Sequence, residues 1–278
     1  MPKCNVCYRC CDIMEGGYGF CEVRTCKDGK VIPDNYGKLT AIALDPIEKK
    51  PLASFFPGSN IVSVGSYGCN LRCPFCQNYH ISWSKDMELS KREAFYVSPE
   101  ELVRIAEEQR QNGNIGVAFT YNEPLISYEY VLDTSKLLKQ NGLKSVLVTN
   151  GMADVSTVGE LFQYVDAMNI DLKGFTDHYY QDLLKGNRKM VMDFIQEAVK
   201  HCHVELTTLI IPGENDSDEE MLEMTSWIRS LGPDIPLHVS RFFPKFHMRD
   251  ADATPVEKIY HLKSIAEQNL TYVYTGNC

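Results

Sequence analysis

Three cysteines, Cys69, Cys73 and Cys76, lie in one short loop with the spacing C-x3-C-x2-C, and this spacing constrains the chain more than any other feature. Three thiolates so close together can hold three irons of a [4Fe–4S] cube and leave the fourth iron without a protein ligand. An iron left open in this way can bind and reduce a small molecule. The alternative is a zinc knuckle, but a structural zinc site takes four protein ligands. The loop offers three, with no histidine before His80.

The loop and the residues around it resemble the radical S-adenosylmethionine (SAM) superfamily. The resemblance lies in the cysteine spacing, in the aromatic Phe75 before the last cysteine and in the strand-like residues 60–65 that lead into the loop. In that superfamily the open iron chelates the amino and carboxylate groups of SAM, and an electron from the cluster cleaves the sulfonium to a 5′-deoxyadenosyl radical. The resemblance therefore implies a [4Fe–4S] cluster, SAM, and an electron donor such as flavodoxin or ferredoxin.

Composition favours an intracellular enzyme. At 278 residues with 44% hydrophobic content, the chain is long enough for a single α/β barrel domain. The net charge is −9 without a basic run, so we expect no nucleic-acid partner. A run of about 18 apolar residues and a signal peptide are both absent, so we expect no membrane and a cytoplasmic location. Eleven cysteines then indicate metal ligation, because cytosolic reductants keep structural disulfides rare.

The chain divides into two regions by pattern. Residues 1–58 are rich in cysteine and glycine and show little helical periodicity, and we predict a cysteine-rich metal-binding segment there. From residue 59 to 278, apolar β-rich runs alternate with amphipathic stretches, which is typical of parallel βα units. This α/β pattern predicts a partial (β/α)6 TIM-like barrel. The predicted strands are 61–66, 115–121, 145–150, 167–172, 204–211 and 237–242, with 272–274 as a last short strand or edge extension. Ser98, Ser217 and Thr254, each followed three places on by glutamate, predict helix starts.

In parallel barrels the reactive groups gather at the C-terminal ends of the strands, so cofactor ligands are expected there. The second strand is followed by Thr120-Tyr121-Asn122-Glu123-Pro124. This segment resembles the Gly-Gly-Glu-Pro turn of radical SAM enzymes, whose carboxylate and backbone bind the amino group of SAM. The resemblance gives that role to Glu123, although Tyr121 and Asn122 replace the usual glycines. The alternative is an ordinary turn capped by Glu123.

The third and fourth strands end in Asn150 and in Asp171-Leu172-Lys173. The Asp-x-Lys alternation places both charged side chains on one face of the strand, and such charges cost stability unless they have partners. Glycyl-radical-enzyme activases, including that of pyruvate formate-lyase, carry similar residues that help to hold the carboxylate and ribose of SAM, in some members with a monovalent cation. By this resemblance Asn150, Asp171 and Lys173 are candidate SAM-site residues. The alternative is a local salt bridge at the barrel rim.

The last two strands offer three further candidates. The fifth strand runs into Ile211-Pro212-Gly213, which resembles the turn that lies along the adenine in the superfamily, so Ile211 is a candidate to pack on the purine. The sixth strand carries His238 and Ser240 on one face and Arg241 on the other. We predict His238 and Arg241 as cofactor-site residues. A strand histidine is, however, more often a core residue with satisfied hydrogen bonds.

A second group of thiols, Cys4, Cys7, Cys11 and Cys21, lies near the N-terminus. A short glycine-rich segment cannot bury enough surface to order itself, so we predict that a metal folds it. Zinc and a second [4Fe–4S] cluster both take four cysteines, and spacing does not decide between them.

The order of this segment, of residues 45–52 and 56–58 and of the cysteine loop closely resembles the radical SAM member of the AmmeMemoRadiSam system, a relative of pyruvate formate-lyase activases. Members usually continue from the second cysteine into Pro-His and from the last strand into another cysteine pair, and this chain has neither. Cys10, Cys26 or Cys278 is therefore an alternative metal ligand.

Two classes of function fit these features. The first is a radical SAM oxidoreductase that abstracts hydrogen from a protein or peptide, as glycyl-radical activases do, or else from a small molecule. The protein would supply geometry and exclusion of water, while the cofactors carry the chemistry. The second is a non-catalytic metal-dependent scaffold, which explains the thiols but not the polar strand ends. The sequence identifies no catalytic side chain beyond the cofactor ligands.

Overall fold

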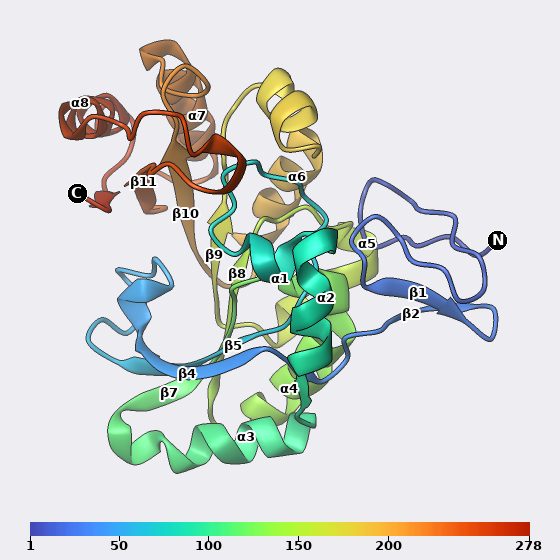
Figure 1. Cartoon of the computed structure of the whole chain (residues 1–278). Coiled ribbons are helices and arrows are strands. Elements are labelled where there is room, and N and C mark those ends of the chain that lie inside the picture. The colour runs from blue at the N-terminus through green and yellow to red at the C-terminus, as the bar shows by residue number, and fades with distance from the viewer.

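The alternating pattern folds into one curved sheet of eight strands (Figure 1). The computed structural model describes the backbone of residues 1–278 and the side chains of all residues except 84–86. The sheet order is β12-β11-β10-β9-β8-β7-β5-β4. Its strands are β4 Ala41–Pro46, β5 Asn60–Gly65, β7 Asn114–Phe119, β8 Lys144–Thr149, β9 Ala167–Asp171, β10 His203–Ile210, β11 Leu237–Arg241 and β12 Val273–Gly276.

The predicted partial barrel is confirmed, with one addition at an edge of the sheet. Strands β5 and β7 to β11 match the six predicted strands, and all pair in parallel. β12 pairs in parallel with β11 and forms the short last strand. β4, from the region predicted as the cysteine-rich segment, pairs antiparallel with β5. Residues before 59 therefore extend the barrel sheet. The division of the chain at residue 58 stays a prediction.

Helices connect the parallel strands and cover the outer face of the sheet (Figure 1). On α3, for example, Leu102, Val103 and Ala106 are buried in the main apolar core. Burying a side chain such as Leu stabilises the fold by about 1.5–3 kcal/mol. The helices are α1 Tyr79–Ser82, α2 Ser84–Glu93, α3 Pro99–Glu108, α4 Tyr128–Gln140, α5 Val155–Val158, α6 Arg188–Ala198, α7 Asp218–Leu231 and α8 Val256–Ala266. Among the helices described, none has the length and apolarity that crossing a membrane requires.

Helices begin within two residues of all three predicted starts, and two of the three hydroxyl residues cap their helices. The hydroxyl of Ser98 accepts a hydrogen bond from the Glu101 N–H at 3.2 Å, and Ser217 caps α7 in the same way through Glu220. Thr254 does not cap its helix, because its hydroxyl instead donates to the Ile210 carbonyl. Helix α8 begins two residues later without a side-chain cap.

The segment that follows β4 packs inside the barrel and fills part of its interior. Ile47, Leu52 and Phe55 are buried against apolar residues that point inward from the strands: Ile61, Ala118, Val146 and Ala167. Because several of these strand residues are small, the segment fits inside the sheet rather than beside it. We call residues 47–58 the floor segment.

The N-terminal residues form a separate lobe beside the barrel (Figure 1). It consists of loops and the hairpin of β1 Arg24–Lys27 and β2 Lys30–Pro33, while β3 Lys38–Leu39 pairs with β6 Phe95–Tyr96. Arg24, whose side chain is almost fully buried, donates two hydrogen bonds to the Glu129 carboxylate on α4, at 2.6 and 2.8 Å. Both bonds come from Nη1, and charge-assisted hydrogen bonds of this kind are short and strong. The lobe is thus fixed to the barrel.

Candidate functional site

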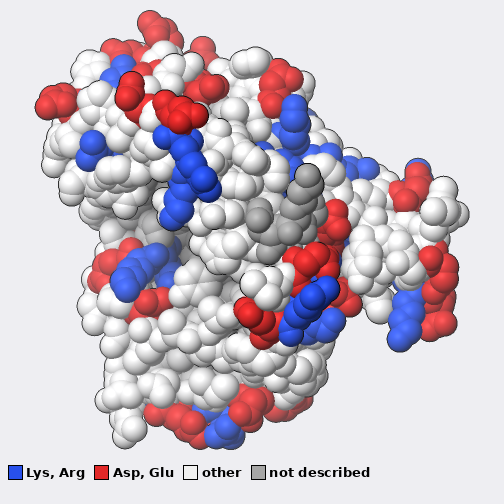
Figure 2. All heavy atoms as spheres, in the orientation of Figure 1, with Lys and Arg blue, Asp and Glu red and all other residues white. Residues whose placement is uncertain are grey.

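A cavity of about 380 Å³ lies at the C-terminal ends of the barrel strands. The three loop cysteines share it with four of the predicted cofactor residues: Glu123, Asn150, Asp171 and Lys173. Lys49 and Lys50 line it from the side of β4, and Asn277 lines it from the side of β12. Figure 2 shows the molecule hollowed between these parts, with basic side chains beside the hollow. The structure therefore gathers the predicted residues from the ends of four strands, β5, β7, β8 and β9, around one space.

The cysteine loop between β5 and α1 is held from several directions. Gly68 has a φ of +87°, and an added Cβ would lie 2.2 Å from a methyl carbon of Val23, so only glycine fits there. The amide of Asn70 donates to the Met152 carbonyl, and that of Asn78 donates to the Tyr121 carbonyl. These bonds fix both sides of the loop to the ends of neighbouring strands.

Burial raises the pKa of all three thiols, that of Cys73 to about 12. Thiols in such a place ionise only if a cation compensates the charge. The sulfur of Cys69 also accepts weak hydrogen bonds from the Leu71 N–H at 3.4 Å and from the Asn150 amide at 3.7 Å, and such bonds adjust the potential of iron–sulfur clusters. One buried and two half-buried thiols that line an open cavity fit a [4Fe–4S] cluster with one iron left free.

Glu123 is buried on the cavity wall, and burial raises its pKa to about 7 although three donors compete with this effect. The carboxylate accepts hydrogen bonds from the Thr149 hydroxyl at 2.6 Å and from the backbone N–H groups of Asn150 and Leu125 at 2.8 and 3.0 Å. A buried carboxylate with a pKa near neutrality is suited to a cationic partner. The hydrogen bond from the Leu125 N–H is a turn cap, so the alternative role of Glu123, an ordinary turn capped by its side chain, is also present.

The residues that replace the glycines of this turn have visible roles. Tyr121 has a φ of +71°, in the region that favours glycine, and its hydroxyl donates to Asp45 at 2.9 Å. Asn122 accepts from the Ser66 N–H and donates to the Tyr67 and Gly68 carbonyls. Tyr121 therefore adopts a strained backbone conformation, and its hydroxyl links the turn to β4.

Asp171 and Lys173 form an ion pair of 2.7 Å at the end of β9. Burial alone would lower the pKa of Lys173, but the Asp171 carboxylate keeps it above the usual range. The salt bridge of the alternative interpretation is therefore present, and both residues also line the cavity.

The other three predicted residues do not line the cavity. Ile211 is fully buried in the main core. His238 bonds to Glu205 at 2.7 Å, and Arg241 donates to the Thr254 carbonyl at 2.6 Å. Their cofactor contacts stay predictions.

Sequence reasoning missed several residues that do line the cavity. Strand alternation could have found Thr207, Leu209 and Ser240, since Thr207 pairs with Asp171 in the β-ladder and Leu209 pairs with Ser240. Lys49 and Lys50 had no such signal, because they lie on the floor segment.

The four N-terminal thiols line one small cavity where the lobe meets the barrel, together with Arg9, Phe20 and Asn70. Burial raises the pKa of Cys7 to about 12, and the other three thiols contribute in the same direction. The alternative ligands do not line this cavity. Cys10 and Cys278 are exposed, and the thiol of Cys26 lies 3.4 Å from the Glu15 carboxylate. Among the described side chains, no group of three or more His, Cys, Asp or Glu residues is arranged for a single metal ion.

The fold and the cavity define a barrel enzyme with a three-cysteine cluster loop. Residues 63–225 match the Radical SAM superfamily. The chain is 40% identical over 278 residues to an uncharacterized protein from Methanocaldococcus jannaschii, which covers 99% of this chain and 81% of that protein. It is 26% identical over 168 residues to pyruvate formate-lyase 1-activating enzyme from Escherichia coli, which covers 59% of this chain and 67% of that enzyme. The chain belongs to the radical SAM superfamily, and membership implies a [4Fe–4S] cluster and SAM.

A solved structure agrees on the fold. SuiB from Streptococcus suis, in a complex with the precursor peptide SuiA, superposes with a TM-score of 0.58 at 15% identity, over 84% of this chain and 51% of that one. At this identity the likeness shows the barrel fold alone.

Proposed function

We propose that this radical SAM enzyme abstracts hydrogen from a protein or peptide, as glycyl-radical-enzyme activases do. One observation carries the proposal: the cysteine loop and the polar ends of three further strands share one cavity. When bound, a [4Fe–4S] cluster supplies an electron that cleaves SAM to a 5′-deoxyadenosyl radical. A scaffold has no need of polar residues at the strand ends, where unpartnered charges cost stability.

The residues around the cavity have complementary roles toward SAM. Glu123 binds the amino group, since a buried carboxylate gains most from a cationic partner. Lys173 binds the carboxylate, and Asp171, its partner at 2.7 Å, faces the ribose or a monovalent cation. Asn150 orients Cys69 through its amide. Val148 and Leu209 provide apolar wall for the adenine. Ile211, His238 and Arg241 receive no role in this proposal, because they do not line the cavity.

The similarity to pyruvate formate-lyase 1-activating enzyme supports a protein or peptide substrate, because that enzyme is named for activating another enzyme. From the motifs of the N-terminal segment, we propose that this enzyme is the radical SAM member of the AmmeMemoRadiSam system. An external one-electron donor such as flavodoxin or ferredoxin completes the reaction. A small-molecule substrate is the competing proposal, since GTP 3′,8-cyclase from Limosilactobacillus fermentum is 26% identical over 183 residues.

We further propose a second metal centre held by Cys4, Cys7, Cys11 and Cys21. It is supported by their shared cavity and by the lack of any larger core in the lobe, where only a few residues such as Val6 are buried. We favour a [4Fe–4S] cluster over zinc, because a barrel that already receives electrons at its first cluster can use a second one for relay or substrate ligation.

The test is anaerobic reconstitution followed by chromatography for 5′-deoxyadenosine, with and without dithionite. Wild-type protein should form the product only with the reductant. The Cys69→Ala/Cys73→Ala/Cys76→Ala variant should form none while keeping its circular dichroism spectrum. Cys202→Ala is the matched control, because this half-buried thiol lies outside both cavities. Product formation by the triple variant would defeat the proposal.

A further inference from the structure

Two neighbouring lysines of the floor segment share one carboxylate at the edge of the cavity. Lys49 and Lys50 both line the cavity. The ammonium of Lys49 lies 3.2 Å from one oxygen of Asp45, and that of Lys50 lies 2.9 Å from the other. Among the described residues, Asp45 is the only hydrogen-bond acceptor of either ammonium, although each has three donors. Two positive charges against one negative charge leave a surplus of one positive charge beside the cavity.

The shared carboxylate is held by a tyrosine of the turn that follows β7. Tyr121 donates its hydroxyl to Asp45 at 2.9 Å, and the ammonium of Lys50 lies 5.0 Å from the centre of the tyrosine ring. Burial opposes the ionisation of Asp45, but the hydrogen bonds from Lys50 and Tyr121 hold its pKa well below the usual range. The charges of this group are therefore present at neutral pH.

The backbone is strained to bring the tyrosine to this place. Tyr121 has a φ of +71°, and Gly65 makes room for its ring, because an added Cβ there would lie 2.6 Å from a ring carbon. Strained residues persist only where their surroundings hold them, and they are frequent at functional sites. The lysine pair is thus a built part of the cavity wall, next to the turn that carries Glu123.

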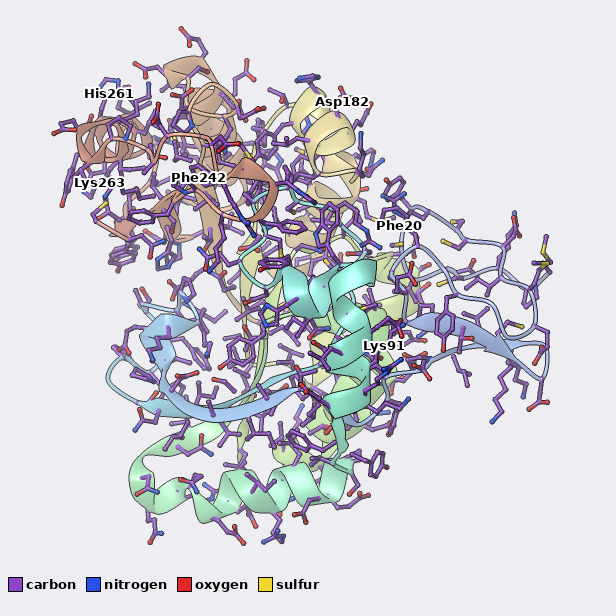
Figure 3. The ribbon with its side chains drawn as sticks, viewed as in Figure 1. Phe20, Lys91, Asp182, Phe242, His261 and Lys263 are labelled. Atoms are coloured by element: carbon purple, nitrogen blue, oxygen red, sulfur yellow. The ribbon has the colours of Figure 1, made fainter. Side chains whose placement is uncertain are left out.

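The two lysines lie at different depths. The side chain of Lys50 is 3% exposed and that of Lys49 is 66% exposed. In Figure 3 the floor segment, which carries both, lies between β4 and the C-terminal half of the sheet, where Phe242 is labelled beside the end of β11. Figure 2 shows basic side chains on both sides of the hollow, although the net charge of the whole chain is −9. The cavity entrance is therefore locally basic on an acidic protein, which favours an anionic group.

The size of the cavity and the surplus charge limit what the lysines can bind. A cavity of about 380 Å³ is near the lower end of the range for one ligand. Bound SAM would leave room for little more than one side chain or one chain end of the substrate. A carboxylate has two oxygens and one negative charge, which match two ammonium groups and the surplus of one charge. A phosphate ester carries about 1.5 to 2 negative charges at pH 7, more than this surplus.

We propose that Lys49 and Lys50 bind a carboxylate of the peptide substrate, supplied by an aspartate or glutamate side chain or by a free C-terminus. The pair thereby selects acidic peptides. Lys49 meets the carboxylate at the entrance, and Lys50 holds it against the wall formed by Tyr121. The inference rests on the proposed function, because it names the chemistry of the substrate at that same cavity.

The test is affinity selection of peptides on the anaerobically reconstituted protein with SAM. The first probe is a pool of acetylated, amidated heptapeptides with a central glycine and random residues elsewhere. The second is the same pool with free C-termini, and the third includes phosphoserine. Mass spectrometry of the bound peptides should show aspartate and glutamate, or free C-termini, enriched at least about tenfold over the corresponding amides. That factor is the lower end of what a hydrogen bond to a charged group contributes.

The exposed Lys49 is the residue to change, because its loss does not disturb the core. Lys49→Gln should lose most of the enrichment, and Lys49→Arg, which keeps the charge, should retain it. Lys144→Gln is the matched control, because Lys144 also pairs with one aspartate, Asp166 at 2.8 Å, but does not line the cavity. This control should select the same peptides as the wild-type protein.

The possible results separate this inference from the proposed function. Peptides selected without an acidic preference, or a preference that survives in Lys49→Gln, would overturn the inference and leave the proposed function standing. Stronger enrichment of phosphoserine than of glutamate would overturn the carboxylate assignment. Weaker SAM binding by Lys49→Gln in calorimetry would also overturn it, because the lysine would then hold SAM rather than substrate. Selection of no peptide at all would overturn the inference together with the peptide substrate of the proposed function.

Discussion

Replacing Glu205 by glutamine should loosen the floor of the barrel. The Glu205 side chain is fully buried, and its two oxygens accept four hydrogen bonds. One oxygen is bonded to His203 and the Ser54 N–H, and the other to His238 and the Ala53 N–H, at 2.7 to 2.9 Å. Glutamine has one acceptor oxygen, so its amide group must face a backbone N–H of the floor segment.

The magnitude follows from two terms. A buried donor left without a partner costs about 1–3 kcal/mol, and hydrogen bonds to a charged acceptor are worth about 1.5–3 kcal/mol. The partners lower the pKa of Glu205 to about 2 against the opposing effect of burial, which corresponds to about 3 kcal/mol of stabilisation at neutral pH. We expect Glu205→Gln to lower the free energy of unfolding by about 3 kcal/mol at pH 7.

The sign of the pH dependence provides a second check. Because the folded-state pKa is depressed below the ordinary 4.5, the stabilisation is fully present well above pH 4.5 and is lost as pH falls toward 2. The difference between wild type and Glu205→Gln should therefore be about 1 kcal/mol smaller at pH 3.5 than at pH 7.

Urea unfolding at both pH values, followed by far-ultraviolet circular dichroism, measures these differences. Glu197→Gln is the matched control, because Glu197 also bonds a histidine, His201, and Lys200, but on the surface. It should cost less than about 1 kcal/mol. A loss below about 1 kcal/mol for Glu205→Gln at pH 7, or a difference that widens in acid, would refute the reasoning.

Three further outcomes are expected. Lys173→Ala and Glu123→Ala should each weaken SAM binding by about 1.5–3 kcal/mol in calorimetry, the range for a charge-assisted hydrogen bond, and unchanged affinity would exclude the proposed contacts. Gly68→Ala should destabilise the protein by more than about 1 kcal/mol in thermal unfolding, because the new Cβ would lie 2.2 Å from Val23. Gly142→Ala, with a φ of +65° and open space, should show only the smaller conformational cost. Anaerobic metal analysis should give about eight irons; about four irons with one zinc would support a structural zinc site, and about four irons without zinc would contradict a second centre.

The barrel strands could be predicted because their apolar runs and the intervening amphipathic stretches are local patterns. β4 could not be found in this way, since its pairing with β5 crosses the whole floor segment and no tight turn joins the two strands. The Thr254 cap failed for a related reason. Its local pattern does mark a helix start, but its hydroxyl accepts from the Phe242 N–H and donates to the Ile210 carbonyl, both at the ends of strands distant in sequence.

The residues of the candidate site divide in the same way, into those that local patterns predict and those that long-range packing places. Glu123, Asn150, Asp171 and Lys173 share the cavity because the ends of parallel strands share one edge, which sequence order alone implies. His238 lies two residues before Ser240 on the inner face, yet it bonds to Glu205 at the floor. The depth of a side chain inside a barrel depends on what fills the barrel below it.

The floor segment therefore does more than complete the core. It lies between the two edges of the open sheet, and the hydroxyl of Ser54 lies 3.4 Å from that of Tyr274 on β12. On one side of this contact the interior is apolar and filled by the floor segment. On the other side, toward the C-terminal ends of the strands, the wall is polar, from Thr207 to Lys50. The cavity that holds the cysteine loop therefore lies on the polar side, at the C-terminal ends of the strands. Because Lys49 and Lys50 belong to the floor segment and Asn277 follows β12, the two sheet edges that the segment bridges also supply the entrance to the cavity.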